Sequence, residues 1–118
     1  MKLVELYKEG SKSIVDSNGK HYLVDDLIEQ SENNEIIKFH ISDLDWIIDH
    51  TEIDEARVKK ADLSIPILVY NDVSQPNHQQ LVVLDGAHRL TKAKRKHHKT
   101  IKGKLLSDKQ VEKSEKSK

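Results

Sequence analysis

Two short stretches of apolar residues constrain the fold of this chain most strongly. Ile65–Tyr70 and Leu81–Leu84 are runs of aliphatic and β-branched residues, the composition of strands that are covered on both faces. The segment between them, Asn71–Gln80, is rich in Asp, Ser, Asn and Gln and contains a proline, as expected of a loop that joins neighbouring strands. We therefore expect two adjacent strands, both central in a sheet.

The chain changes from strand to helix composition directly after the second run. Asp85-Gly86 is a turn signal, and Ala87 to about His97 has helical spacing with Leu90 and Ala93 facing inward. Thr100–Leu106 then alternates as a final strand, which we expect at the edge of the sheet.

The residues before Ile65 predict a strand and two helices. Ile36–Ile41 is a β-type run that stops at Ser42, a helix N-cap candidate with Asp45 three residues on. The short helix that follows carries Leu44, Ile47 and Ile48 inward. Thr51 is a second cap candidate, before a helix over 52–61 in which Glu55 and Lys59 are spaced for an ion pair.

The first 35 residues are harder to interpret. Asn18-Gly19 is a hairpin turn signal between Ile14-Val15 and Tyr22–Val24. A helix that starts near Tyr22 is the competing interpretation, and we favour a strand that turns into a helix near Asp25.

These elements predict a small α+β protein with a mixed sheet and helices packed on it. The chain of 118 residues has the length of one domain. We divide it into an N-terminal strand and helix extension (1–35), the domain itself (36–106) and a charged tail (107–118). The tail has almost nothing to bury, so we expect it to be disordered or a frayed helix.

Composition excludes several classes of protein. The chain has no cysteine, which rules out disulfides, thiolate metal sites and a cysteine nucleophile. No stretch approaches the ~20 apolar residues that span a bilayer, and the N-terminus lacks a secretory signal. We expect a soluble, cytoplasmic protein without a membrane partner.

Charge is distributed unevenly along the chain. Residues 88–118 hold twelve Lys and Arg against three acids, a net charge of +9, and residues 1–87 carry −9. The basic third is suited to a nucleotide phosphate, to nucleic acid, or to the acidic part of the same molecule.

The corner at 85–89 is the candidate site. A glycine allows a sharp turn and close approach of a ligand, and the free amide groups of the helix start favour an anion. Arg89 can bind phosphate through two hydrogen bonds, His88 can carry a proton, and Asp85 can accept a proton or hold Mg²⁺. The structural alternative is a plain N-cap, a turn glycine and a solvated helix start.

The order of elements and the Asp85-Gly86-Ala87-His88-Arg89 sequence resemble the ParB N-terminal and sulfiredoxin superfamily. The resemblance covers 36–106, including the Ser-Asp-Leu segment at 42–44 and the Ile65–Val69 strand. It implies a ParB/sulfiredoxin-like fold with nucleotide phosphates at Gly86, Ala87, His88 and Arg89. Relatives with the Asp-Gly-x-His-Arg form include kinases of small molecules that use ATP or ADP, and phage proteins.

Departures from the family pattern narrow the function. Sulfiredoxins have a catalytic cysteine where this chain has Ala87, so sulfiredoxin activity is excluded. Chromosome-partition proteins have Gly-Glu-Arg-Arg in a CTP site and a helix-turn-helix domain after it, so a full partition protein is excluded as well. Free-serine kinases use a glutamate from an early segment, for which Glu52 and Glu55 are candidates by position.

The resemblance thus implies a nucleotide-binding domain that acts as a nucleotide hydrolase or phosphotransferase. ATP or another nucleotide would be the cofactor, with Mg²⁺ held partly by Asp85. Asp85 and His88 would be the catalytic residues, and Arg57 would help to line the nucleotide pocket. For Arg57 the alternative is a solvated helix residue paired with Asp54 or Asp62.

The alternative to a nucleotide site is a nucleic-acid-binding, inhibitory or protein-interaction module that uses the basic third. The candidate residues are Lys92, Lys94, Arg95, Lys96 and Lys99, although the scarcity of aromatic residues argues against a platform for stacked bases. Trp46 is expected to pack in the core, His97 and His98 to contact solvent, and the histidines show no metal-ligand spacing.

Overall fold

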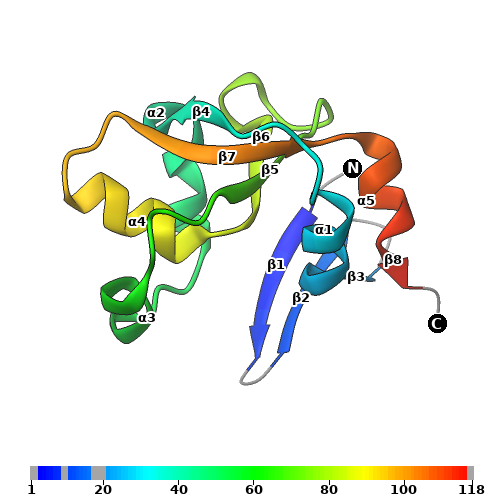
Figure 1. Cartoon of the computed structure of the whole chain (residues 1–118), viewed down its shortest axis with the longest axis horizontal. Helices are drawn as coiled ribbons and strands as arrows, with labels where there is room; N and C mark the ends of the chain where they lie inside the picture. The colour runs from blue at the N-terminus through cyan, green and yellow to red at the C-terminus, as the bar shows by residue number, and fades with distance from the viewer. Residues whose placement is uncertain (1–2, 9–10, 17–20, 117–118) are drawn as a thin grey trace.

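The computed structural model describes residues 3–8, 11–16 and 21–116, with side chains from Tyr22 to Ser114. It is a small α+β protein with two four-stranded sheets (Figure 1). The first sheet is antiparallel, in the order β1 (Leu3–Lys8), β2 (Ser11–Asp16), β3 (His21–Leu23) and β8 (Glu115–Lys116). The second is mixed, in the order β4 (Ile37–His40), β7 (Thr100–Leu106), β5 (Ile67–Asn71) and β6 (Leu81–Asp85).

The mixed sheet differs from our expectation in the order of its strands. β7, predicted at the edge, lies between β4 and β5, antiparallel to the first and parallel to the second. β6, predicted to be central, is an edge strand that pairs only with β5. Its residues from Val82 to Asp85 are nevertheless buried, so the run of apolar residues reports cover on both faces and not the number of neighbouring strands. The alternation of residue types in β7 has another cause: Ile101 points to the buried face of the sheet, and Lys102 points to solvent.

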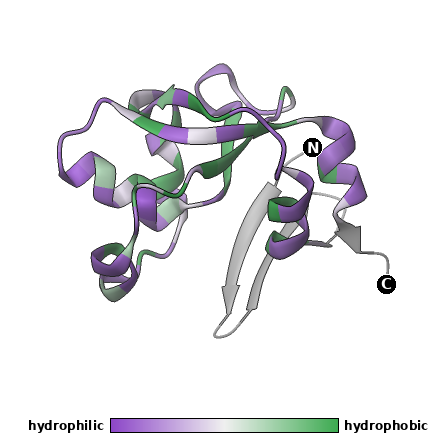
Figure 2. Cartoon of the chain, viewed as in Figure 1, coloured by the Kyte–Doolittle hydropathy of each residue, from purple (hydrophilic) through white to green (hydrophobic). Residues whose placement is uncertain are grey.

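Helices cover the mixed sheet from below in the view of Figure 1. α2 (Ile41–Leu44) contacts β4 and β6, and α4 (Ala87–Arg95) contacts β5 and β7. The 3₁₀ helix η1 (Asp45–His50) and α3 (Glu55–Lys60) pack against α4, and a second 3₁₀ turn, η2 (Asn77–Gln79), lies in the loop between β5 and β6. Apolar residues gather between these layers (Figure 2).

Both predicted helix caps are wrong. Ser42 lies inside α2, which begins at Ile41 and has His40 as its N-cap. The Ile41 amide donates to the Lys99 carbonyl, so a backbone contact lies at the start of this helix where we expected a serine cap. Thr51 ends η1, where its hydroxyl donates to Ile47. Asp54 caps α3 instead by accepting a hydrogen bond from the Ala56 amide.

The N-terminal prediction is largely confirmed. β2 and β3 form an antiparallel pair with Ile14 opposite Tyr22, while the Asn18-Gly19 turn itself lies outside the described residues. The strand β3 passes directly into α1 (Val24–Gln30), close to the predicted change at Asp25.

The C-terminal segment is more ordered than predicted. Ser107 and Gln110 form a reciprocal cap at the start of α5 (Asp108–Lys113), and Val111 is buried against the core. The Gln110 side chain also donates to Gln30 and to Asn34. Burial of Val111 and this amide network contribute to docking the helix on α1.

The indole of Trp46 donates to the Leu81 carbonyl at 3.0 Å, and the ring packs against the core, as predicted. Among the described residues, none of the helices combines the length and the apolar character needed to cross a membrane.

One side-chain contact joins the mixed sheet to the C-terminal helix. The hydroxyl of Tyr70 donates to Asp108 at 2.5 Å, across from β5 to the first turn of α5. Burial, and then the Asp108 carboxylate, raise the pKa of Tyr70 above its usual value because both disfavour the phenolate.

We expect Tyr70→Phe to lower the free energy of unfolding by about 1.5 kcal/mol at pH 7 to 8, as for a hydrogen bond to a charged group. Because the pKa of Tyr70 is higher in the folded than in the unfolded protein, its protonated hydroxyl stabilises the folded state fully below pH ~10. This contribution is lost as the pH rises further. The gap between wild type and Tyr70→Phe in urea unfolding should therefore narrow above pH ~10. A gap that is constant from pH 7 to 11 would contradict the role of this hydroxyl.

Candidate functional site

The predicted corner forms between β6 and α4. Gly86 has φ +115° and is the N-cap of α4, a backbone conformation that side chains with a Cβ rarely adopt. A Cβ at this position would come within 2.9 Å of the Ile67 Cβ. The space that we assigned to a ligand is therefore occupied by the Ile67 side chain from β5, and the need for glycine comes from packing inside the protein.

Arg89 is not at an exposed helix start. Its Nη2 donates to Asp85 Oδ2 at 2.8 Å, and its Nη1 donates to the carbonyls of Ile65 (3.1 Å) and Pro66 (2.8 Å). The side chains of Arg89 and Asp85 are only 13% and 7% exposed. This guanidinium therefore joins α4, the end of β6 and the segment that enters β5.

The turn that carries Ile65 is fixed by Asp62. Its carboxylate accepts hydrogen bonds from the amide (2.9 Å) and the hydroxyl (2.7 Å) of Ser64. These two hydrogen bonds hold the pKa of Asp62 below its usual value. The carbonyls that Arg89 binds are thus presented by a turn with its own local support.

His88 and Ala87 are both buried. The Asp54 amide donates to His88 Nε2 at 3.1 Å, so the imidazole supports the start of α3. Arg57 is half-buried on the same helix. The structure therefore places His88 and Arg57 with α3, while Asp85 and Arg89 face another part of the molecule.

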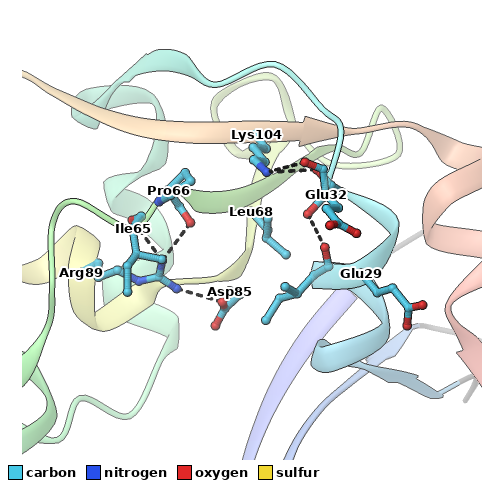
Figure 3. A pocket seen from close by; sticks show the side chains of 10 residues that line it. Glu29, Glu32, Ile65, Pro66, Leu68, Asp85, Arg89 and Lys104 are labelled. Carbon is cyan, nitrogen blue, oxygen red and sulfur yellow. Dashed lines mark hydrogen bonds and ion pairs between the residues drawn. The ribbon is translucent and has the colours of Figure 1, made fainter.

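Asp85 and Arg89 border a pocket of about 420 Å³ between α1 and the mixed sheet (Figure 3). Leu68 lies beside both Asp85 and Lys104 in the strand register. The apolar part of the wall comes from Ile28, Ile65, Pro66 and Leu68. Lys104 also lines the pocket, where its amine points toward the Glu32 side and donates to the carbonyls of Ser31 (3.1 Å) and Glu32 (3.2 Å) (Figure 3).

Our sequence interpretation missed the pocket residues that do not belong to the corner. α1 supplies Ile28 and Glu29, and Glu32 follows it in the chain, although this segment was predicted to be an extension outside the domain. The only sequence signal was Ile28, an apolar residue on a short amphipathic helix. Glu52 and Glu55, our candidates for an early glutamate, do not line the pocket.

Most of the predicted basic stretch contacts the protein itself. Lys92 donates to the carbonyls of Lys59 and Ala61, and Lys94 pairs with Asp45 at 3.3 Å. Arg95 binds both oxygens of Glu55, which lowers the pKa of Glu55 and raises that of Arg95. Lys94 and Arg95 thus neutralise acidic residues of the same chain. The acidic part of the molecule was one of the three partners that the charge distribution suggested. Lys96 and Lys99 are exposed.

Mg²⁺ at Asp85 stays a prediction. Arg89 occupies one oxygen of Asp85, and the described part of the chain holds no group of three or more His, Asp or Glu that could bind a metal ion.

A scan against protein-family models and a search of curated proteins found no match to this chain. Its likeness to the ParB and sulfiredoxin superfamily therefore stays a prediction that depends on the corner sequence and the order of elements.

Two arginines on α4 allow a matched test of the corner. Arg89→Ala should lower the free energy of unfolding by about 3 kcal/mol, because it removes the ion pair with the buried Asp85 carboxylate and the hydrogen bonds to Ile65 and Pro66. Arg95→Ala removes an exposed pair in the same helix and should cost far less. Urea unfolding of both variants measures the difference, and equal losses would show that Arg89 does not hold the corner together.

Gly86→Ala tests the turn. The added Cβ must displace Ile67 and accept a positive φ, so we expect a loss of about 2 to 4 kcal/mol from strain and repacking. The melting temperature of the variant is the measurement. A wild-type melting temperature would mean that the corner can relax at little cost.

Proposed function

We propose that this protein binds a nucleotide in the pocket between α1 and the Asp85–Arg89 corner. The observation that carries the proposal is that two residues of the predicted motif border one pocket together with Lys104 and an apolar wall. The proposed site thus lies on the side of the corner that faces α1, and not over the buried helix start.

The size and lining of the pocket suit such a ligand. Small-molecule sites usually enclose roughly 300–1,000 Å³ and combine apolar walls with a few polar groups, and this pocket measures about 420 Å³. The base would contact Ile65 and Leu68, and the phosphates would lie near Lys104. The Lys104 ammonium has three donors and uses two of them on the carbonyls of Ser31 and Glu32. Arg89 adds positive charge, although its hydrogen bonds are already made within the protein.

We extend the proposal to a ParB/sulfiredoxin-like nucleotide hydrolase or phosphotransferase. Phosphoryl transfer requires mainly positioning and neutralisation of charge, which Lys104 and Arg89 would provide. Asp85 is the residue of the predicted catalytic pair that borders the pocket, so it is the candidate base. His88 is better explained as support for α3, since its ring accepts the Asp54 amide.

A tryptophan at Ile65 is expected to block the pocket. Ile65 lines it yet is 52% exposed, so Ile65→Trp should add bulk with little effect on the core. Val73→Trp is the matched control, because Val73 is 77% exposed and does not line the pocket. Calorimetry with ATP, ADP and CTP, each with and without Mg²⁺, should show binding to wild type and Val73→Trp and at least a tenfold loss in Ile65→Trp.

Release of inorganic phosphate from ATP, measured on the same samples, separates a hydrolase from a domain that only binds. Absence of binding by every nucleotide at millimolar concentration would refute the proposal. Equal affinities of the two tryptophan variants would place the ligand elsewhere.

A further inference from the structure

Two lysines that are 64 positions apart in the sequence lie opposite each other in the mixed sheet. Lys38 on β4 pairs in register with Lys102 on β7, and both side chains are exposed. Like charges that face each other across two strands are destabilising. Within the described part of the chain, neither lysine has an ion pair. This arrangement gathers two positive charges at one place on the surface.

The same face of the sheet leads into the pocket. Side chains two residues apart on a strand share a face, so Lys102 and Lys104 point to the same side of β7. Gly103 lies beside Ile67, which places Lys102 next to Pro66, a residue of the pocket wall. We call Lys38 and Lys102 the lysine pair. By register Lys102 lies next to the pocket wall, Lys38 lies one strand further away on β4, and Lys104 lines the pocket.

The spacing of these charges suits an extended polyanion. Lys102 and Lys104, two apart on β7, are about 6.7 Å apart, a distance comparable to that between successive phosphates of an extended nucleic-acid strand. Lys38 lies directly across from Lys102, at about 5 Å. By contrast, Lys92, Lys94 and Arg95 of the basic helix are occupied by contacts within the protein. The surface suited to a second phosphate is therefore the lysine pair and not the helix.

The pocket favours a single strand over other polyanions. It has room for one unstacked nucleotide, whereas the bases of a duplex are paired and stacked. An apolar wall of Ile65, Pro66 and Leu68 can contact the face of one base, so the pocket does not need the aromatic platform that bases stacked in series require. An acidic peptide carries no planar base to place against this apolar wall.

We propose that the pocket and the lysine pair together bind the end of a single-stranded nucleic acid. The terminal nucleotide occupies the pocket, and the next phosphates contact Lys102 and then Lys38. This inference rests on the nucleotide pocket proposed above, and names its ligand as the end of a strand.

Calorimetry with unlabelled octathymidylate, thymidine monophosphate and a blunt duplex of equal length tests the inference. We expect the octamer to bind wild type at least tenfold more tightly than the monophosphate, and more tightly than the duplex. The Lys38→Gln/Lys102→Gln variant should lower the ratio of octamer affinity to monophosphate affinity on the order of tenfold. The slope of log affinity against log salt should fall by about 1.4, at ~0.7 for each phosphate contact on a single strand.

The matched control is Lys59→Gln/Lys60→Gln, which removes the same charge from exposed positions on α3. It should keep the wild-type ratio and slope. The lysine-pair variant should fold, because the substitution removes repulsion from two exposed positions, and its melting temperature checks this. Ile65→Trp should lose binding of both the monophosphate and the octamer.

The outcomes distinguish this inference from the proposed function. Binding of the monophosphate with no gain for the octamer refutes the inference and leaves the nucleotide pocket. If neither the monophosphate nor the octamer binds, both the inference and the nucleotide pocket are refuted. The inference would be overturned if Ile65→Trp bound the octamer as tightly as wild type, or if the two lysine variants lost octamer affinity equally. It would also be overturned if wild type bound the duplex as tightly as the octamer, or if an equimolar polyglutamate peptide displaced the octamer.

Discussion

The Arg89 guanidinium is the contact on which the rest of this structure depends. It binds Asp85 at the end of β6 and the carbonyls of Ile65 and Pro66 before β5, so one planar group with several donors joins a helix, a strand and a turn. Its partners are an ionised carboxylate and two backbone oxygens that would otherwise have to be satisfied by water, and hydrogen bonds of this charge-assisted kind are the stronger ones. The same contact forms one wall of the pocket. Stability and the candidate site are therefore not separable at this corner.

The positive charge of the C-terminal third has two different roles in the folded protein. On α4, Lys94 and Arg95 pair with acids from η1 and α3, which brings the acidic and basic parts of the chain together. On the mixed sheet, Lys102 and Lys104 share one face, and Lys38 joins them from the acidic part of the sequence. A run of basic residues is thus divided by secondary structure, since a helix and a strand direct neighbouring side chains to different places. The ligand class that we propose follows from that division and not from net charge.

Much of the fold could be predicted from local patterns, and the failures have common physical causes. The strand and helix composition around 65–106 predicted β5, β6, α4 and β7 in their correct order along the chain. The position of β6 and β7 within the sheet was wrong because side-chain burial does not report how many strands pair with a backbone. The burial of Arg89 could not be read from the sequence either: a polar residue in the first turn of a helix is exposed only if no other segment covers that turn, and here 65–66 does.

The sequence by itself determined the α+β class and the order of the main elements, because these depend on propensities and periodicities of residues that are close in the chain. Tertiary structure decided which groups share a site. It brought Ile28 of α1 and Glu32, which follows α1, to the pocket beside the corner. It also placed Lys38 opposite Lys102 and directed His88 to the start of α3. The spacing of residues along a chain carries little information on contacts of this kind, which are fixed when the sheet register and the packing of helices are fixed together.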